Sequence, residues 1–151
     1  MRVFTAMQAM GQGIETSYVQ ILAETLQVDP DCIEIVQGDS DVAQGLGSMG
    51  SRSLYIGGSA MQTASKQAID VGRDLASKAL EAPAADLVYA EGRYKVVGTD
   101  LGIDLTALAQ QQPERRIAVT TVQKVGGPSW PNGCHVCEVE IEPETGHVEI
   151  A

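Results

Sequence analysis

The sequence is poor in basic residues, and this scarcity restricts the partners that the protein can bind. Ten lysines and arginines stand against twenty aspartates and glutamates in 151 residues, which gives a formal net charge of −10. A surface of this sign repels phosphate backbones and anionic lipid headgroups. We therefore expect neither nucleic acid nor a membrane among the partners.

Long apolar runs and a leader-like N-terminus are also missing. No run reaches the roughly 18 apolar residues that a membrane helix requires, and the first ten residues lack the charged-then-apolar layout of a signal peptide. These absences predict a soluble, cytoplasmic chain. Its length suits one domain with a core, and its abrupt extended start predicts that residues 1–151 are one lobe cut from a larger subunit.

Cysteine is sparse, which excludes a disulfide framework. The three cysteines are Cys32, Cys134 and Cys137, too few and odd in number. Cys134 and Cys137 have the spacing of half a zinc site, but no second pair exists, and residues three apart on the strand expected here face opposite sides. We expect structural cysteines and no metal site, and we expect His135 to be a hydrogen-bonded core residue rather than a ligand.

Glycine, by contrast, gathers in two loops that each precede a helical pattern. Gly11 and Gly13 flank Gln12, and apolar residues then recur at helical spacing to Leu26. A second run, GLGSMGSRS at 45–53, leads into a helix predicted over about 51–80. Glycines that take a positive φ, and the amides of a helix N-terminus, suit a phosphate. A serine-capped turn is the alternative for the second loop, and a solvent-exposed side chain is the alternative for Gln12.

Neither loop fits a common nucleotide fingerprint. Thr16 stands where a G-x-G-x-x-G motif needs its third glycine, and the second loop has no Gly-Lys-Ser/Thr. The Rossmann and P-loop interpretations therefore both fail.

The remaining patterns predict an α+β fold of two layers, with helices at about 14–27 and 51–80 on one face of a mixed sheet. Strands are expected at 2–6, 33–36 and 117–122, together with a hairpin over 86–98 that turns at Glu-Gly and a last hairpin closed by 143–146. A short helix is expected within 101–112, and Trp130, in an irregular loop at 125–133, is expected to cover the local core. Small residues on the second helix predict a close backbone approach, namely Gly57, Ala60, Ala64, Ala68 and Gly72.

Four motifs together resemble a known family. They are MGQGIET at 10–16, GDS at 38–40, GSMGSRS at 47–53 and HVCEVEIEPETG at 135–146. In this order they are similar to the molybdopterin-binding domain of the xanthine dehydrogenase, aldehyde oxidase and carbon monoxide dehydrogenase large-subunit family. The resemblance covers nearly the whole chain.

The resemblance implies a cofactor site and partners. It implies that Gln12, with Gly11 and Gly13, contacts the pterin, and that the second loop holds the phosphate or dinucleotide end through Ser48, Gly50, Ser51 and Ser53. The implied cofactor is molybdopterin, as molybdopterin cytosine dinucleotide in the full subunit. Implied partners are the remaining lobes of that subunit and iron–sulfur and FAD subunits or domains, and the implied reaction oxidises an aldehyde, an N-heterocycle or purine, or carbon monoxide.

The chain departs from this family in ways that limit its chemistry. The family's catalytic glutamate follows a D-x-G-x-x-x-N-P stretch, and neither occurs here. We expect no catalytic residue in this chain, solvated carboxylates at Glu15, Glu24 and Glu138, and no activity from the lobe alone. A large apolar face should remain exposed and allow a homo-oligomer to form. Two alternatives stay open: a non-catalytic binding or assembly module without the cofactor, and a site for another phosphorylated ligand.

Overall fold

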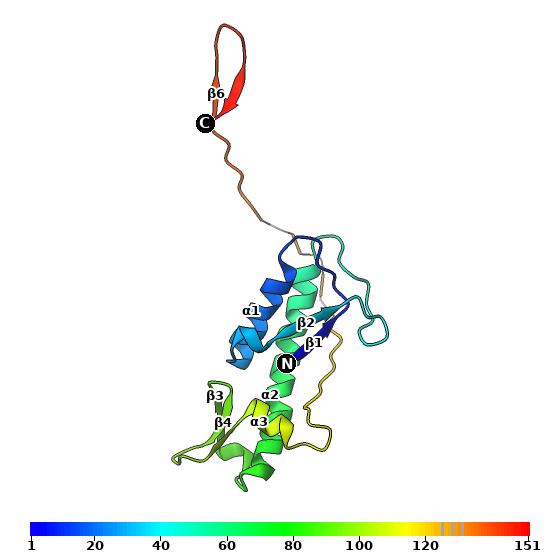
Figure 1. Cartoon of the computed structure of the whole chain (residues 1–151), viewed down its shortest axis with the longest axis vertical. Coiled ribbons are helices and arrows are strands. Elements are labelled where there is room, and N and C mark those ends of the chain that lie inside the picture. Colours follow the sequence, from blue (N-terminus) through cyan, green and yellow to red (C-terminus); the bar gives the residue numbers. More distant parts are fainter. Residues whose placement is uncertain (125, 128, 131) are drawn as a thin grey trace.

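The computed structural model describes all residues except 125, 128 and 131, and its centre is a pair of helices flanked by small sheets (Figure 1). The helices are α1 (Ile14–Leu26), α2 (Ser59–Ala79) and α3 (Leu105–Gln110). Three short turns are also helical: η1 (Pro30–Cys32), η2 (Ser53–Gly58), which is a π-helix, and η3 (Ala84–Asp86). The strands are β1 (Arg2–Thr5), β2 (Glu34–Gln37), β3 (Leu87–Ala90), β4 (Arg93–Val96), β5 (Gly102–Asp104), β6 (Val139–Ile141) and β7 (Val148–Ile150).

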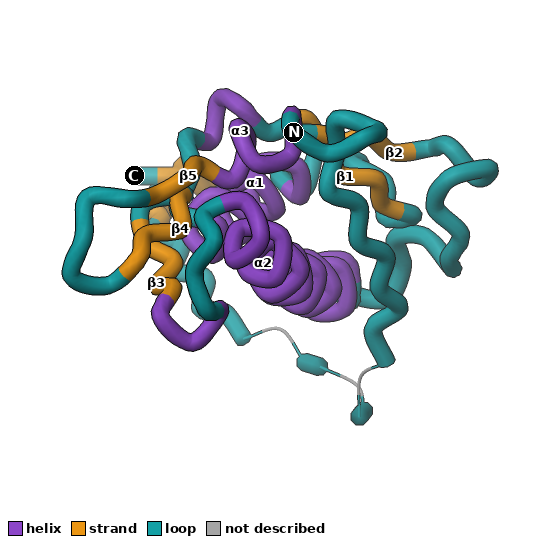
Figure 2. Tube along the Cα trace, turned by 90° about the horizontal axis from the view of Figure 1, so that it is seen from below, coloured by secondary structure: helices purple, strands orange, loops and turns teal. Residues whose placement is uncertain are grey.

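The strands form three small sheets, which confirms the α+β class and divides the expected mixed sheet into parts. β1 and β2 are parallel, β3–β4–β5 are antiparallel, and β6–β7 is an antiparallel hairpin. At about 1.5 Å per residue, the 21-residue α2 is long enough for two sheets to lie near different ends. Figures 1 and 2 show β1–β2 and β3–β5 at separate places along this helix.

Helix α1 has the bounds that the apolar spacing predicts. Tyr18, Leu22 and Leu26 recur every four residues and are buried. Gly13 at the N-cap and Gln27 at the C-cap both have a positive φ, 71° and 51°. The chain then turns through Pro30 into η1, where the Asp29 carboxylate accepts a hydrogen bond from the Asp31 amide at 2.9 Å. The helix thus ends where the sequence indicates.

The core consists of two clusters that share α1 and α2. One cluster lies beside β1–β2 and contains Ile14, Tyr18, Leu22 and Met61. The other packs against β3–β5 and contains Leu26, Ala76, Leu87, Tyr94, Leu105 and Leu108. Because both helices contribute to both clusters, the two sheets are tied to one helical pair.

Two tyrosines pack directly onto glycines at opposite ends of the small-residue stripe. A Cβ atom at Gly57 would overlap the Tyr18 hydroxyl, and one at Gly72 would overlap the Tyr94 hydroxyl, with the ring Cζ atoms at 2.6 and 2.9 Å. The hydroxyls donate hydrogen bonds to the Ser53 and Ile69 carbonyls at 2.6 and 2.8 Å. The glycines are thus needed for close packing, but a tyrosine side chain approaches each of them, not the backbone that the stripe of small residues predicts.

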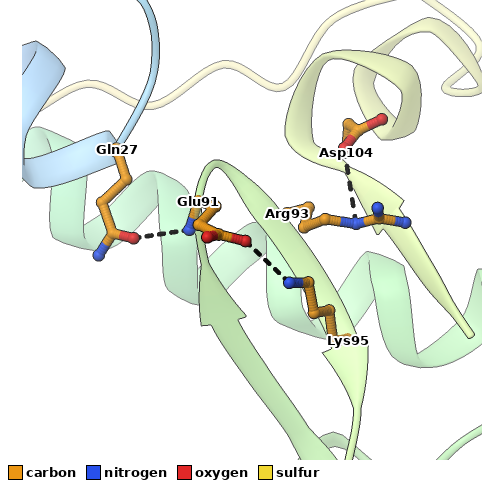
Figure 3. Close-up of polar contacts among 5 residues, drawn as sticks. All are labelled: Gln27, Glu91, Arg93, Lys95 and Asp104. Atoms are coloured by element: carbon orange, nitrogen blue, oxygen red, sulfur yellow. Dashed lines mark hydrogen bonds and ion pairs between the residues drawn. The ribbon is translucent and has the colours of Figure 1, made fainter. Parts of the chain in front are cut away.

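The β3–β4 hairpin turns at Glu91 and Gly92, as predicted, and both residues have a positive φ (54° and 73°). The Glu91 amide donates to Gln27 Oε1 at 2.6 Å, which ties the turn to the end of α1 (Figure 3). A hydrogen bond from Lys95 at 2.9 Å, together with its charge, lowers the pKa of the Glu91 carboxyl. Arg93 Nε lies 3.6 Å from Asp104 Oδ1, and Asp104 immediately precedes α3.

The C-terminal quarter corrects several expectations. Residues 117–122 form no strand, and Cys134, His135 and Cys137 precede β6 and are exposed rather than structural or core residues. Trp130 is 80% exposed and covers no core. One physical reason explains these differences: a strand or a buried side chain needs a partner to pack against. Figure 1 shows the β6–β7 hairpin away from the helical pair, so the described residues of this part of the chain have no such partner there. Positions 125, 128 and 131 of the predicted loop lie outside the described residues.

The hairpin itself is confirmed, with Gly146 at φ 73° in its turn. Val139 opposes Ile150 and Ile141 opposes Val148, so these four side chains share one face, while Glu140 opposes Glu149 on the other. All six residues are exposed. Among the helices that the structure describes, none combines the length and hydropathy of a membrane span.

We predict that Gly72→Ala destabilises the protein, although helix propensity alone favours alanine. The added methyl group collides with Tyr94, and overpacking of a core costs about 1–3 kcal/mol, which exceeds the propensity gain of roughly 1 kcal/mol. Urea unfolding should show a lower free energy of unfolding for this variant.

Two comparisons test that cause. Gln67→Ala changes an exposed position of the same helix and should leave the free energy of unfolding nearly unchanged. The double variant Gly72→Ala/Tyr94→Phe lacks the colliding hydroxyl and should lose less than the sum of the single losses. Additive losses would contradict the packing argument.

Candidate functional site

The two glycine loops lie together because β1 and β2 are parallel. The first glycine loop, residues 6–13, follows β1, and the second glycine loop, residues 38–52, follows β2. The register pairs Thr5 with Gln37, so both strands end at the same edge of the sheet. Ligands of open α/β sheets bind at this edge, beyond the carboxyl ends of the strands.

Direct hydrogen bonds join the two loops through Gln8 and Ser48. The Gln8 amide donates to Ser48 Oγ at 2.9 Å, and Ser48 Oγ donates to the Gln8 carbonyl at 2.8 Å. The Ser48 amide donates to Gln8 Oε1 at 2.9 Å. The two bends that the sequence places some 35 residues apart in the chain are therefore neighbours in space.

Glycine serves two different purposes in the second loop. Gly47 and Gly50 have a positive φ, 72° and 58°, as expected. Gly45 was also expected to have one and does not; its Cβ would instead lie 2.7 Å from the Ala6 Cβ, so it is needed for close packing of the loops. Ser51 has φ 55°, a conformation that is strained for a residue with a side chain.

Gln12 is turned toward its own loop. Its Oε1 accepts a hydrogen bond from the Met10 amide, and its Nε2 donates to the Gln8 carbonyl at 3.0 Å. We expected this carboxamide to face something outside the loop, and in the protein by itself it closes the loop instead. A contact between Gln12 and a cofactor stays a prediction.

The predicted serines of the second loop occupy three different environments. The Ser48 hydroxyl is used in the contact with Gln8. Ser51 and the adjacent Gly50 are exposed. Ser53 begins η2, and its carbonyl accepts the Tyr18 hydroxyl. Of the predicted donors to an anion, the exposed backbone at 50–51 is the part that solvent, and hence a ligand, can reach.

A cationic side chain that sequence reasoning missed completes the second loop. Arg52 is half-buried, and its Nη2 atom is buried with no hydrogen-bond partner among the described residues, as are the Nε atoms of Arg73 and Arg93; of the three arginines, Arg52 is the one in this loop. Leaving a buried charged donor without a partner is unfavourable, and an anionic group supplies such a partner. The residues present therefore fit a phosphate at this loop.

Gln8 and Gln37 were also missed: Gln8 lies outside the four motifs, and Gln37 lies at the end of a strand pattern, one residue before the GDS motif. Gln37 Oε1 accepts the Ala9 amide at 2.6 Å, and its Nε2 donates to Glu15 Oε1 at 2.7 Å. The first loop is thus held from β2 by Gln37 and within itself by the contact between Gln12 and Gln8. Within the described part of the chain, no group of three or more His, Cys, Asp or Glu side chains is placed to hold a metal ion.

Burial raises the pKa of the Tyr18 hydroxyl, which anchors η2, to about 12. The pKa of Tyr89 is likewise raised to about 12, and that of Tyr94 is raised further. The cause is desolvation of the tyrosinate form, which is unfavourable in the core.

Comparison with known proteins gives consistent matches over the whole chain. The family model described as the molybdopterin cofactor-binding domain matches residues 1–151. Subunit gamma of the 6-hydroxypseudooxynicotine dehydrogenase complex of Paenarthrobacter nicotinovorans is 36% identical over 95% of this chain. The carbon monoxide dehydrogenase large chain of Hydrogenophaga pseudoflava is 32% identical over 93%. The chain spans 19% of the length of each of these relatives.

Solved structures match the fold as well as the sequence. The Cu,Mo-CO dehydrogenase in its carbon monoxide reduced state superposes with a TM-score of 0.64 at 34% identity, over 69% of this chain and 13% of that one. Quinoline 2-oxidoreductase from Pseudomonas putida 86 superposes with a TM-score of 0.63 at 28% identity, over 77% and 15%.

The tyrosine pKa values predict a loss of stability at high pH. Tyr18 ionises at about 12 when folded, against an ordinary value of 10.0, so the unfolded chain loses its proton first as the pH rises. The contribution of the protonated Tyr18 hydroxyl to the free energy of unfolding is complete below about pH 10 and decreases between about pH 10 and 12. Urea midpoints measured from pH 9 to 11.5 should fall, and less steeply for Tyr18→Phe. A midpoint that stays constant over this range would be inconsistent with buried tyrosines.

Proposed function

Because this chain belongs to the molybdopterin cofactor-binding domain family, we propose that its paired glycine loops hold part of a molybdenum cofactor in the large subunit of an oxidoreductase. The observation that supports this most directly is the Gln8–Ser48 contact, which brings both loops to one edge of the β1–β2 sheet. A binding site assembled from two loops suits a ligand with two chemically different ends.

We assign the anionic end of the cofactor to the second loop. Gly50 and Ser51 are exposed and offer their backbone amides together with the Ser51 hydroxyl, and the Arg52 guanidinium has a buried donor without a partner among the described residues. A charge-assisted hydrogen bond to a phosphate satisfies that donor. The strain at Ser51 is also typical of a backbone held in position for a ligand. The hydroxyl of Ser48 and the carbonyl of Ser53 then support the loop through their hydrogen bonds to Gln8 and Tyr18.

We assign the pterin end to the first loop, at Gly11, Gln12 and Gly13. The Gln12 carboxamide has a donor pair and an acceptor, which match the edge of a pterin. In the protein by itself both are bonded within the loop, so the contact requires Gln12 to exchange these hydrogen bonds for the cofactor. We propose molybdopterin cytosine dinucleotide as the form bound.

The bound cofactor supplies the redox chemistry, and the residues of this chain supply binding and orientation. We expect the catalytic glutamate to lie outside this chain and the lobe alone to be inactive. The substrate class that we propose, an aldehyde, an N-heterocycle or purine, or carbon monoxide, is the one that the family resemblance implies. Iron–sulfur and FAD subunits or domains are the proposed electron acceptors.

Exposed apolar side chains on the same loops support a further proposal, that the remaining lobes of the large subunit dock here. Met10 is 69% exposed and Leu46 76%, and Val42, Met49 and Leu54 are each more than half exposed. Several exposed apolar side chains within one short stretch, residues 42–54, are more than the single scattered ones that a monomer usually shows. The chain spans 19% of its relatives, so the rest of the parent subunit is the partner to which we assign this surface.

We predict that the chain, produced together with the enzymes of molybdenum cofactor synthesis, retains pterin after gel filtration. Gln12→Ala and Ser51→Ala should each lower the retained pterin, measured by fluorescence after oxidation, by about tenfold, the effect of one lost hydrogen bond to a charged or polar ligand. Gln20→Ala, at an exposed position of α1, should retain the wild-type amount. A wild-type chain without pterin would favour the alternative of a non-catalytic assembly module.

We also predict that the isolated chain self-associates through the apolar surface of the loops. Sedimentation velocity in about 0.15 M salt, which screens the net charge, should show a concentration-dependent oligomer. Leu46→Glu should weaken association at least tenfold, whereas Leu101→Glu, an exposed leucine between β4 and β5, should not. Equal effects of both substitutions, or a monomer throughout, would argue against this surface.

A further inference from the structure

Gln8 contacts both halves of the proposed site. Its side-chain Oε1 accepts the Ser48 amide of the second loop, and its carbonyl accepts Gln12 Nε2 of the first loop at 3.0 Å. The same carbonyl accepts the Ser48 hydroxyl at 2.8 Å. The residue assigned to the pterin and the loop assigned to the phosphate are therefore oriented by one residue.

From these contacts we infer that Gln8 is a positioning residue that couples the two glycine loops, so that pterin binding at one loop depends on the conformation of the other. The inference rests on the proposed function. Gln8 itself is not a ligand in this inference, because its Oε1 is already bonded to the second loop.

Besides Gln8, the second loop is held by the packing of Gly45 on Ala6 and, just beyond its end, by the Tyr18–Ser53 hydrogen bond. After β2 ends at Gln37, residues 38–52 contain no helix or strand, and ordering each such residue costs about 1–2 kcal/mol of conformational entropy. The contacts with Gln8 occur at the residue after Gly47 and two residues before Gly50. They thus fix the loop immediately before the amides that we assign to the phosphate.

Gly47 shows that this contact is tightly packed. A Cβ at this position would lie 2.7 Å from Gln8 Oε1 and 3.1 Å from Nε2. The backbone there also has φ 72°, which disfavours any other residue. Glycine is thus required at 47 both for the turn and for the approach of Gln8. A substitution at Gly47, in the second loop, therefore disturbs the Gln8–Ser48 contact without changing Gln8 itself.

The test uses the 151-residue chain with and without cofactor. Gln8→Met keeps the length of the side chain and removes the acceptor of the Ser48 amide. Without cofactor, hydrogen exchange of that amide should accelerate at least tenfold, while the melting temperature changes little. With cofactor, the retained pterin should fall at least tenfold, and the visible circular dichroism of the remaining cofactor should change. Gln20→Met is the matched control and should alter none of these measurements.

Further variants separate coupling from a local effect. Ser48→Ala removes the other two hydrogen bonds, and Gly47→Ala displaces Gln8, so each should also lower the retained pterin. The double variant Gln8→Met/Ser48→Ala should lose less than the product of the two single losses, because the hydrogen bonds that the two changes remove hold the same pair of residues together. Independent, multiplied losses would overturn the coupling.

The results also distinguish this inference from the proposed function. If the wild type retains pterin and Gln8→Met retains as much, while its Ser48 amide exchanges faster, the inference is wrong and the proposed function stands. If the wild type retains no pterin, the proposed function is wrong, and the inference is overturned with it. Faster exchange together with lost pterin and a changed dichroism supports both.

Discussion

The packing of two tyrosine hydroxyls onto glycines of the central helical segment is the constraint on which the rest of the structure depends. Tyr18 reaches Gly57 from α1, and Tyr94 reaches Gly72 from β4. Each contact is possible only without a Cβ atom, and each hydroxyl finds a carbonyl acceptor in η2 or α2. Because Gly57 precedes α2 and Gly72 lies in its second half, one contact fixes α1 beside the glycine loops and the other fixes the β3–β5 sheet.

The site depends on this packing through η2. The Tyr18 hydroxyl bonds the carbonyl of Ser53, the first residue of η2 and the second after the strained Ser51. The surroundings must over-determine such a conformation for it to persist, and here it is held by Tyr18 on one side and by Gln8 on the other. The geometry of the loops is thus a consequence of core packing as well as of glycine content.

The sequence predicted what local signals determine and missed what distant contacts determine. The apolar spacing of α1 and the Glu91-Gly92 turn encode their own structures, and both were confirmed. The strand expected at 117–122 and the buried setting expected for His135 needed partners that the pattern does not specify, and both were wrong. In the site, glycine-rich motifs located the loops, but Gln8 carries no local signal because its role arises from a tertiary contact. Arg52 stands in the second motif, and only the burial of its Nη2 atom distinguishes it from a solvent-exposed arginine.

The β6–β7 hairpin has a consequence for how the chain unfolds. Its apolar residues, from Val139 at 44% to Ile150 at 82% exposed, bury little surface, and Glu140 faces Glu149 across the strands. A two-stranded hairpin of this kind is marginal in water, and like charges directly opposite weaken it further. Heat or denaturant should therefore melt it ahead of the helical pair as a separate, non-cooperative step. A covering surface on its apolar face would merge that step with the main transition.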